Sequence, residues 1–314
     1  MKIAILEPIG LTECKFQPIK RHFEEQGHQV VFFPDRNEDE AELIRRAEGA
    51  DAIVLSNIPL TENFIDACPN LSMISVAFTG VDHIDMKACN RRNILVSNAA
   101  GFSTESVAEL TIGMILSVYR KIVSGDAITR AFGGRGNFLG TELNGKTLGI
   151  IGAGAIGLRV AEIAKVFNCE VLAWSRTEKV VEGVKFVDKE TLLQNSDIVS
   201  LHVPLTDETR DLIGTDELKM MKSTSILINT ARGPVVNSVA LDEALKDGEI
   251  AGASLDVYEQ EPPLPKEHVL FESPNLVMLP HLAFATNESF EKRIQIVMDN
   301  IQLWLEGKPR NIMN

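Results

Sequence analysis

A glycine triplet between two apolar, strand-like runs constrains the fold of this chain more than any other feature. The runs are 148–151 and 171–174, and the glycines, Gly152, Gly154 and Gly157, open a helical pattern between them. In such a unit the first glycine permits a tight turn, the second lets a pyrophosphate approach the backbone, and the third lets the helix pack closely on the strand. The pattern therefore predicts a binding site for a dinucleotide, NAD or NADP.

The cofactor phosphates would lie at the start of that helix. The backbone amides there, at Ala155 and Ile156, have no partner within the helix. The positive end of the helix dipole adds to their attraction for a phosphate.

The residues after the second apolar run bear on the choice between the two cofactors. A carboxylate about twenty residues beyond the glycines binds the adenosine ribose hydroxyls of NAD. Ser175, 18 residues beyond Gly157, stands there instead and is followed by Arg176 and Thr177. A guanidinium and two hydroxyls can bind a 2′-phosphate. We expect NADP, with NAD as the alternative because the carboxylate of Glu178 is close by.

The composition describes a well-cored protein with room for two domains. The chain has 314 residues, of which 45% are hydrophobic and 24% charged, and its formal net charge is −13. This charge argues against nucleic acid and anionic membranes as partners, because both would repel the protein. An anionic substrate is not excluded, since Arg176 and Arg232 can supply positive potential locally.

No segment predicts export, membrane insertion or metal binding. The first residues hold too short an apolar run for a signal peptide, and the apolar region 110–119 is interrupted by polar residues. The four cysteines lack C-x-x-C spacing, which fits reduced thiols, and no cluster of His, Cys and carboxylates has metal-ligand spacing. We expect a cytoplasmic protein without a metal.

Strand-like and helical patterns alternate along the whole chain. Between 145 and 280 we expect strands at 147–151, 170–174, 198–201, 225–229, 252–256 and 276–279, with helices starting near Ala155, Thr191, Asp216 and Val239. The first hundred residues repeat the alternation, with strands at 2–6, 30–33, 52–55, 73–77 and 94–97 and helices at 18–26, 38–47 and 61–67. This alternation predicts an α/β fold with parallel sheets.

We therefore expect two Rossmann-like domains. A dinucleotide-binding domain with a doubly wound parallel sheet would span 100–284, and a smaller, flavodoxin-like substrate domain would combine 1–99 with 285–314. Crossing helices are expected at 104–120 and 287–304, and the glycine-rich segment 132–136 is expected to be a surface loop. Ligands bind outside the carboxyl ends of such strands, which predicts a substrate cleft between the domains.

Three polar residues stand just beyond the ends of predicted strands of the second domain. They are Arg232, Glu261 and His281. Each alone can be structural, but together they supply the roles that hydride transfer to a ketone requires. Arg232 can polarise the carbonyl oxygen and bind a carboxylate, and His281 can donate the proton. Glu261 can orient the imidazole and favour its protonated form.

Over essentially its full length the chain resembles the D-isomer-specific 2-hydroxyacid dehydrogenase family. The resemblance rests on several segments in one order besides the glycine triplet. They are FTGVDHID at 78–85, SVAEL at 106–110, LHVPLT at 201–206 with Thr209, NTARG at 229–233, GASLDV at 252–257, Glu261-Pro262 and Pro280-His281.

This resemblance implies a role for each matching site. Arg232, Glu261 and His281 would be the catalytic residues, and the backbone amides near Thr79 and Gly80 would bind the substrate carboxylate along with Arg232. Asp256 would hold the nicotinamide carboxamide. The remaining residues implied in cofactor binding are Gly152, Gly154, Ala155, Ile156, Gly157, Ser175, Arg176, Thr177, His202, Pro204, Thr209, Thr230 and His281. The resemblance also implies a homodimer formed through the nucleotide domains.

The segment HLAFAT at 281–286 most resembles glycerate dehydrogenases and hydroxypyruvate or glyoxylate reductases. In those enzymes an arginine at the position of Arg176 accompanies NADP. We expect an NAD(P)H-dependent reductase of a short 2-keto acid, such as glyoxylate or hydroxypyruvate, that also runs in reverse. One alternative is an NAD-dependent dehydrogenase of D-lactate or a bulkier D-2-hydroxy acid. Another is a dinucleotide-sensing, corepressor-like binding protein, since such proteins keep the same three residues.

Overall fold

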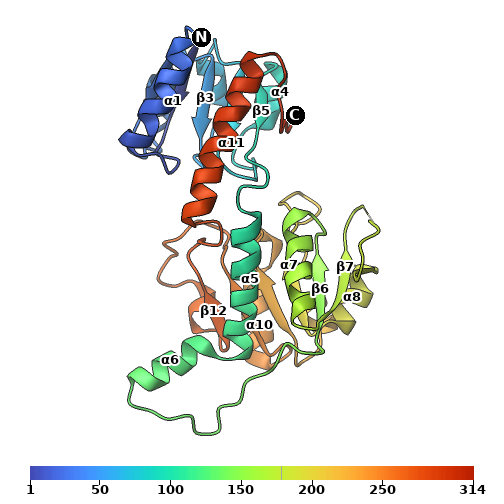
Figure 1. Cartoon of the computed structure of the whole chain (residues 1–314). Helices are drawn as coiled ribbons and strands as arrows, with labels where there is room; N and C mark the ends of the chain where they lie inside the picture. The colour runs from blue at the N-terminus through green and yellow to red at the C-terminus, as the bar shows by residue number, and fades with distance from the viewer. Residues whose placement is uncertain (178) are drawn as a thin grey trace. The chain divides into compact units, whose positions relative to one another are not determined.

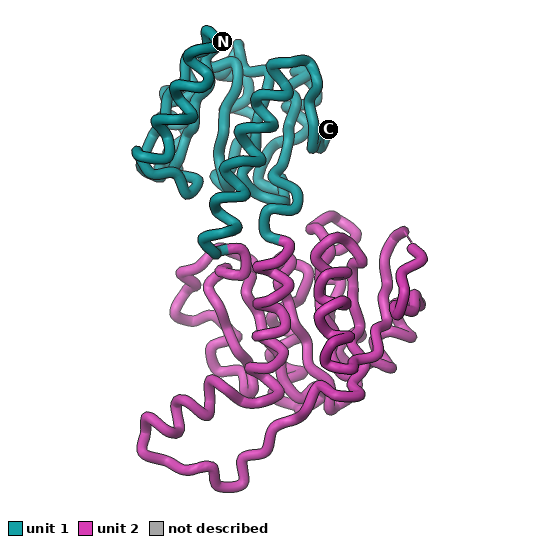
Figure 2. Tube along the Cα trace, viewed as in Figure 1, with its two compact units in different colours: residues 1–103, 285–314 teal, residues 104–284 magenta. Residues whose placement is uncertain are grey.

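The chain divides into two compact units in a computed structural model that describes residues 1–177 and 179–314. Unit 1 comprises residues 1–103 and 285–314, and unit 2 comprises residues 104–284 (Figure 2). The division falls between residues 103 and 104, whereas the sequence places it between 99 and 100.

Among the described residues, unit 1 is built on a parallel sheet of five strands. In sheet order they are β2 (Gln29–Phe32), β1 (Lys2–Ile5), β3 (Ala52–Leu55), β4 (Met73–Val76) and β5 (Leu95–Ser97). The order 2-1-3-4-5 is that of flavodoxin-like folds. β3 and β4 are buried along their whole length, as expected for central strands with helices on both faces.

The helices of unit 1 begin at polar caps. They are α1 (Glu13–Glu25), α2 (Glu40–Ala47), α3 (Glu62–Ala67), α4 (Met86–Arg91) and α11 (Asn287–Leu305). Each follows a Thr or Asp whose side chain accepts a hydrogen bond from a first-turn amide. α11 lies against β4, where the Ser75 hydroxyl donates to the Val297 carbonyl at 3.3 Å (Figure 1).

Within the described ranges, unit 2 has a parallel sheet of seven strands. In sheet order they are β12 (Leu276–Met278), β11 (Gly252–Leu255), β10 (Ile226–Asn229), β9 (Ile198–Leu201), β6 (Thr147–Ile151), β7 (Glu170–Trp174) and β8 (Lys185–Phe186). Counted from β6, this is the doubly wound order 3-2-1-4-5-6 with one further strand. The order reverses between β6 and β9, and a ligand crevice is therefore expected at their carboxyl ends.

Alternate residues of these strands enter two separate cores. Ile226 and Ile228 of β10 pack with α5 (Thr104–Tyr119) and α7 (Ala155–Val166), whereas Leu227 packs on the opposite face. That opposite face is covered by α8 (Lys189–Asn195), α9 (Thr215–Met220) and α10 (Ser238–Asp247), with the short 3-10 helices η1 (Gly233–Val235) and η2 (Val269–Glu272). Burial on both faces makes the sheet a rigid support for the loops at its edge.

One segment of unit 2 is largely outside this core. Helix α6 (Ile122–Arg130) has no buried residue, and an irregular segment follows it to residue 146 (Figure 1). We call residues 122–140 the arm. Four of its large apolar side chains are exposed: Ile122 and Val123 are about half exposed, Leu139 is 73% exposed and Phe132 is fully exposed.

The parallel sheets and the α/β class confirm the fold expected from the sequence. The expected strands of both units are present, each end shifted by at most one residue. The sequence analysis missed α4, α6 and the two-residue strand β8. It also began α1 at Pro18, whereas Thr12 caps the helix a turn and a half earlier and Pro18 lies inside it.

None of the helices in the described part of the chain combines the length and the apolar character that crossing a bilayer needs. The cytoplasmic location stays a prediction.

Candidate active site

Arg232, Glu261 and His281 follow three neighbouring strands of unit 2. β10, β11 and β12 pair in parallel, and their carboxyl ends therefore lie at one edge of the sheet. Arg232 comes three residues after β10, Glu261 six residues after β11, and His281 three residues after β12. This is the edge at which ligands of open α/β sheets bind.

The structure brings His281 and Glu261 into direct contact. His281 Nδ1 lies 2.8 Å and 2.9 Å from the two carboxylate oxygens of Glu261. An ionised carboxylate only accepts hydrogen bonds, so Nδ1 carries the donated hydrogen and Nε2 is the nitrogen left for proton exchange. The imidazole is 15% exposed, whereas the Glu261 side chain is 60% exposed. The pair therefore combines an enclosed imidazole with a more accessible carboxylate.

Asp256 anchors the segment that carries His281. Its side chain is fully buried, and its two oxygens accept the backbone N–H groups of Leu282 at 2.8 Å and Ala283 at 2.9 Å. Its carbonyl accepts the N–H of His281 at 2.8 Å. Burial raises the pKa of the Asp256 carboxyl, and the two amide hydrogen bonds oppose that rise. These contacts hold His281 at a φ of +54°, a left-handed conformation that is uncommon for residues other than glycine.

The Arg232 turn packs directly on the loop that leads to Glu261. A Cβ on Gly233 would lie 1.8 Å from the carbonyl carbon and oxygen of Tyr258, and only glycine permits this approach. Buried Asn229 shapes the turn, donating to the Arg232 carbonyl and accepting from the Ala231 amide, both at 2.9 Å. Arg232 itself is half-buried, and its Nη1 donates to the Ala231 carbonyl at 2.9 Å.

The glycine triplet forms an open cradle at the start of α7. Gly152 has a φ of +104°, and a Cβ there would lie 2.5 Å from the His202 carbonyl oxygen. A Cβ on Gly157 would lie 2.2 Å from the carbonyl oxygen of Gly152, where helix and strand meet. Gly154 and Ala155 are exposed, and the space around Gly154 is open. The residues present therefore fit a dinucleotide pyrophosphate held by first-turn amides.

Two cations lie beside the end of β7 and the cradle. Ser175 is half-buried, and Arg176 and Thr177 are exposed. Lys179, which the sequence analysis did not single out, donates from Nζ to the carbonyl of Ala153, within the glycine segment, at 3.3 Å. Glu178, whose carboxylate is the reason for NAD as the alternative cofactor, lies outside the described residues.

The other predicted cofactor residues of unit 2 stand near the same edge. His202 follows β9, and its Nε2 lies 2.9 Å from the Ser200 hydroxyl. Burial of the ring lowers the pKa of His202 to about 3, so the imidazole is neutral. Thr209 donates to the Pro204 carbonyl at 2.7 Å, and the Thr230 hydroxyl lies 3.2 Å from that of Thr111.

Thr79 and Gly80 belong to unit 1, where they follow β4. The Thr79 carbonyl accepts from the Asn98 side-chain amide at 2.7 Å, and the Phe78 carbonyl accepts from the amide of Ala99 at 2.9 Å. Thr79 is exposed and Gly80 is half-buried. These contacts fix the turn at the carboxyl edge of that sheet.

Outside residue 178, the structure has no group of three or more His, Cys, Asp or Glu side chains that could hold a metal ion. Cys14 is exposed, and Cys68, Cys89 and Cys169 are buried free thiols. Burial raises the pKa of Cys68 and of Cys89 to about 11, so both are protonated at neutral pH.

Comparisons with known proteins identify the family that this chain resembles in sequence and fold. The protein-family model described as "D-isomer specific 2-hydroxyacid dehydrogenase, NAD binding domain" matches residues 112–283 of this chain. A glyoxylate reductase of Thermofilum pendens is 43% identical over 90% of this chain and 85% of its own length. A glycerate dehydrogenase of Methylorubrum extorquens is 36% identical over 87% of this chain and 88% of its own length. An acyclic imino acid reductase solved with NADPH and D-Arg is 31% identical, covers 100% of both chains and has a TM-score of 0.91.

The neutral His202 predicts how the protein responds to acid. Its folded pKa of about 3 lies below the ordinary 6.5, so between these values the unfolded state binds one proton more. The free energy of unfolding should therefore fall as the pH drops from about 6 to 4. His202→Gln should reduce that slope by up to about 1.4 kcal/mol per pH unit.

Urea unfolding of the cofactor-free protein across this pH range measures the slope. His22→Gln, at an exposed histidine of α1, is the control and should leave the slope nearly unchanged. Equal slopes for the wild type and His202→Gln would contradict a neutral His202.

Proposed function

The chain belongs to the D-isomer-specific 2-hydroxyacid dehydrogenase family, and we propose that it interconverts a short 2-keto acid and its D-2-hydroxy acid. The observation that carries the proposal is the His281–Glu261 pair, which shares with Arg232 the sheet edge that also holds the dinucleotide cradle. The substrate class we propose is glyoxylate or hydroxypyruvate. Relatives named glyoxylate reductase and glycerate dehydrogenase support that choice.

Reduction requires a hydride at the carbonyl carbon and a proton at the carbonyl oxygen. A bound reduced nicotinamide supplies the hydride. His281 donates the proton from Nε2, because Nδ1 is already held by Glu261. Arg232 stabilises the negative charge that develops on the oxygen and pairs with the substrate carboxylate. In the reverse direction the neutral imidazole takes the proton back.

In this proposal Asp256, besides fixing the His281 segment, holds the nicotinamide carboxamide. The backbone amides near Thr79 and Gly80 bind the substrate carboxylate. Both turns are fixed by the hydrogen bonds described above, which supports their use as preorganised binding groups.

Initial rates with glyoxylate, hydroxypyruvate, pyruvate and a branched 2-keto acid, each with NADPH and NADH, test the substrate class. Fastest turnover of the two short acids supports the proposal. Preference for pyruvate or the branched acid would favour a dehydrogenase of D-lactate or a bulkier acid. Absence of turnover together with tight dinucleotide binding would favour a corepressor-like binding protein.

His281→Ala should nearly abolish reduction and leave cofactor binding almost intact. General acid catalysis contributes about 10²–10⁴-fold, and this residue acts in the chemical step. Steady-state rates and a fluorescence titration with the reduced cofactor measure the two effects. The control is His22→Ala, at an exposed histidine. His268 is unsuitable as a control because it contacts Glu259 in the loop that carries Glu261. Activity of His281→Ala within about threefold of the wild type would remove His281 from the mechanism.

We propose NADP as the preferred cofactor. Arg176 follows β7 directly and is exposed, and Lys179 reaches the carbonyl of Ala153 in the glycine segment. Two cations on this stretch of chain favour a 2′-phosphate. The NADPH in the similar imino acid reductase supports this choice, whereas the NAD binding domain description keeps NAD as the alternative.

Arg176→Ala should weaken NADPH binding by about ten- to a hundredfold, since a charge-assisted hydrogen bond is worth about 1.5–3 kcal/mol. NADH, which lacks the phosphate, should bind almost as before, and the effect on NADPH should shrink at high salt. Lys185→Ala removes a charge from the neighbouring strand β8 and is the matched control. A wild-type preference for NADH, or an equal effect on both cofactors, would contradict NADP.

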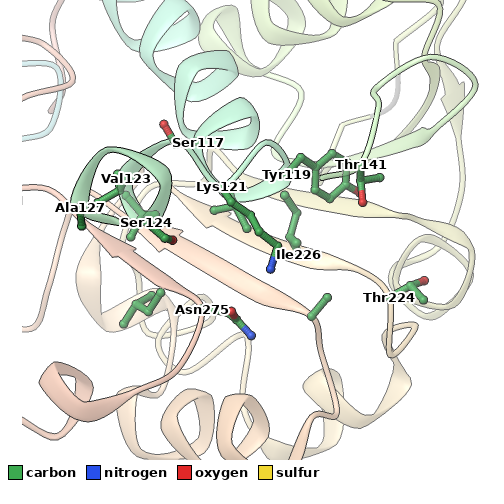
Figure 3. A pocket seen from close by; sticks show the side chains of 14 residues that line it. Ser117, Tyr119, Lys121, Val123, Ser124, Ala127, Thr141, Thr224, Ile226 and Asn275 are labelled. Carbon is green, nitrogen blue, oxygen red and sulfur yellow. The ribbon is translucent and has the colours of Figure 1, made fainter. Parts of the chain in front are cut away.

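We also propose that two copies associate through unit 2. The exposed apolar side chains of the arm support this, because burying apolar surface against a second copy removes it from water, which is favourable. A cavity of about 370 Å³ lies beside the arm, lined by residues of α5, α6 and the amino ends of β10 and β12 (Figure 3). It offers a recess for apolar side chains of the second copy.

Sedimentation velocity should show a dimer for the wild type and weaker association for Phe132→Ser/Leu139→Ser. Val180→Ser, at a fully exposed valine outside the arm, should leave the dimer unchanged. A monomeric wild type, or an equal effect of all these substitutions, would contradict association through the arm.

A further inference from the structure

Besides the Glu261–His281 pair, the loop after β11 forms a second carboxylate–histidine pair, Glu259–His268. Glu259 precedes Glu261 by two residues, in the loop that follows β11, and its Oε2 lies 3.3 Å from Nε2 of His268. Glu259 also accepts a hydrogen bond from the side chain of Ser238, the first residue of α10. Burial opposes ionisation of Glu259, but the hydrogen bonds from Ser238, the backbone and His268 outweigh it and lower the pKa of the carboxyl. Glu259 is therefore an ionised anchor and not a proton carrier at neutral pH.

The contacts of His268 fix both of its ring nitrogens. Nδ1 accepts the N–H of Leu270 at 3.4 Å, where His268 caps the 3-10 helix η2. Nδ1 is thus the acceptor, which leaves the hydrogen on Nε2 to be donated to Glu259. The ring packs between Tyr258, with centroids 6.1 Å apart, and Phe271, with centroids 5.8 Å apart. Only 12% of the His268 side chain is exposed, so its orientation is set by packing as well as by hydrogen bonds.

The residue on the other side of Glu259 is held just as firmly. Tyr258 is buried, and its hydroxyl lies 2.9 Å from the carbonyl of Leu279 and 3.1 Å from that of Leu255. Leu279 comes two residues before His281, which links the Glu261 loop to the segment that carries the imidazole. The turn at Gly233 also packs against the backbone of Tyr258. The loop is therefore fixed up to residue 259, two positions before the carboxylate that meets His281.

We propose that Glu259, held by Ser238 and His268, is a positioning residue for Glu261. Glu261 extends from a loop, and its side chain is 60% exposed. With the backbone fixed at Glu259, the Glu261 carboxylate stays within hydrogen-bond distance of His281 Nδ1. Loss of the anchor would let the loop shift, and a displacement of about 1 Å at a reacting group can cost up to roughly a hundredfold in rate. This inference rests on the proposed role of the His281–Glu261 pair.

The test compares Glu259→Gln, His268→Phe and their double variant with Glu261→Gln. Glu272→Gln, the same chemical change at an exposed position of η2, is the matched control. We expect kcat to fall by about tenfold in each single anchor variant while KM for the keto acid and the Kd of the reduced cofactor change little. The kcat of the double variant should be no lower than that of either single variant, because each single change already removes the Glu259–His268 contact.

The pH profile of kcat separates positioning from mere stability. Glu261→Gln removes the carboxylate that contacts His281 Nδ1, so reduction should begin to fall at lower pH than in the wild type. Glu259→Gln and His268→Phe should move the profile in the same direction by a smaller amount. An unmoved profile with only a lower melting temperature would overturn the positioning role.

Two further outcomes keep the proposals distinguishable. If Glu261→Gln itself leaves rate and profile unchanged, the proposed function of the pair fails. If Glu261→Gln acts as expected while the anchor variants match Glu272→Gln, only the positioning inference fails. Ser238→Ala removes one hydrogen bond from Glu259 and serves as the anchor variant if the larger changes prevent folding.

Discussion

The hydrogen bonds of Asp256 hold together the part of the molecule on which the proposed chemistry depends. A buried carboxylate is costly unless its oxygens are hydrogen-bonded, and here each oxygen accepts one backbone amide of the segment after His281. The carbonyl of the same residue accepts the N–H of His281 itself. Three bonds from the end of β11 thus fix the chain that leaves β12. The imidazole can then meet Glu261, although its backbone has a φ of +54°.

The parallel sheet of unit 2 explains why so many functional groups share one edge. The strand order reverses between β6 and β9, which places the cradle of Gly152 beside the end of β9. Arg232, Glu261 and His281 follow the next strands along that edge. Tyr258 connects their loops. Its backbone packs against the turn at Gly233, and its hydroxyl donates to the carbonyl of Leu279. Dinucleotide binding and proton transfer are therefore supported by one rigid layer.

Local sequence patterns predicted much of this arrangement, and long-range contacts account for what they missed. Apolar runs and the glycine triplet identified the strands and the cradle because their signals lie within a few residues. Helix α6 follows Lys121, whose φ is +53° and whose side chain makes no cap, so the usual start signal is missing. β8 has two residues and forms only by pairing with β7. The anchor of Glu259 by His268 depends on the chain returning nine residues later, which no spacing rule describes.

The handedness of the product tests the central claim most directly. If His281 delivers the proton while Arg232 holds the substrate carboxylate, the keto acid presents one face of its carbonyl to the reduced nicotinamide. Hydroxypyruvate is suited to this test because its reduction creates a chiral centre, whereas reduction of glyoxylate does not. Chromatography of the product on a chiral column should give D-glycerate alone. L-glycerate, a racemic mixture, or no glycerate with either NADPH or NADH would contradict the account.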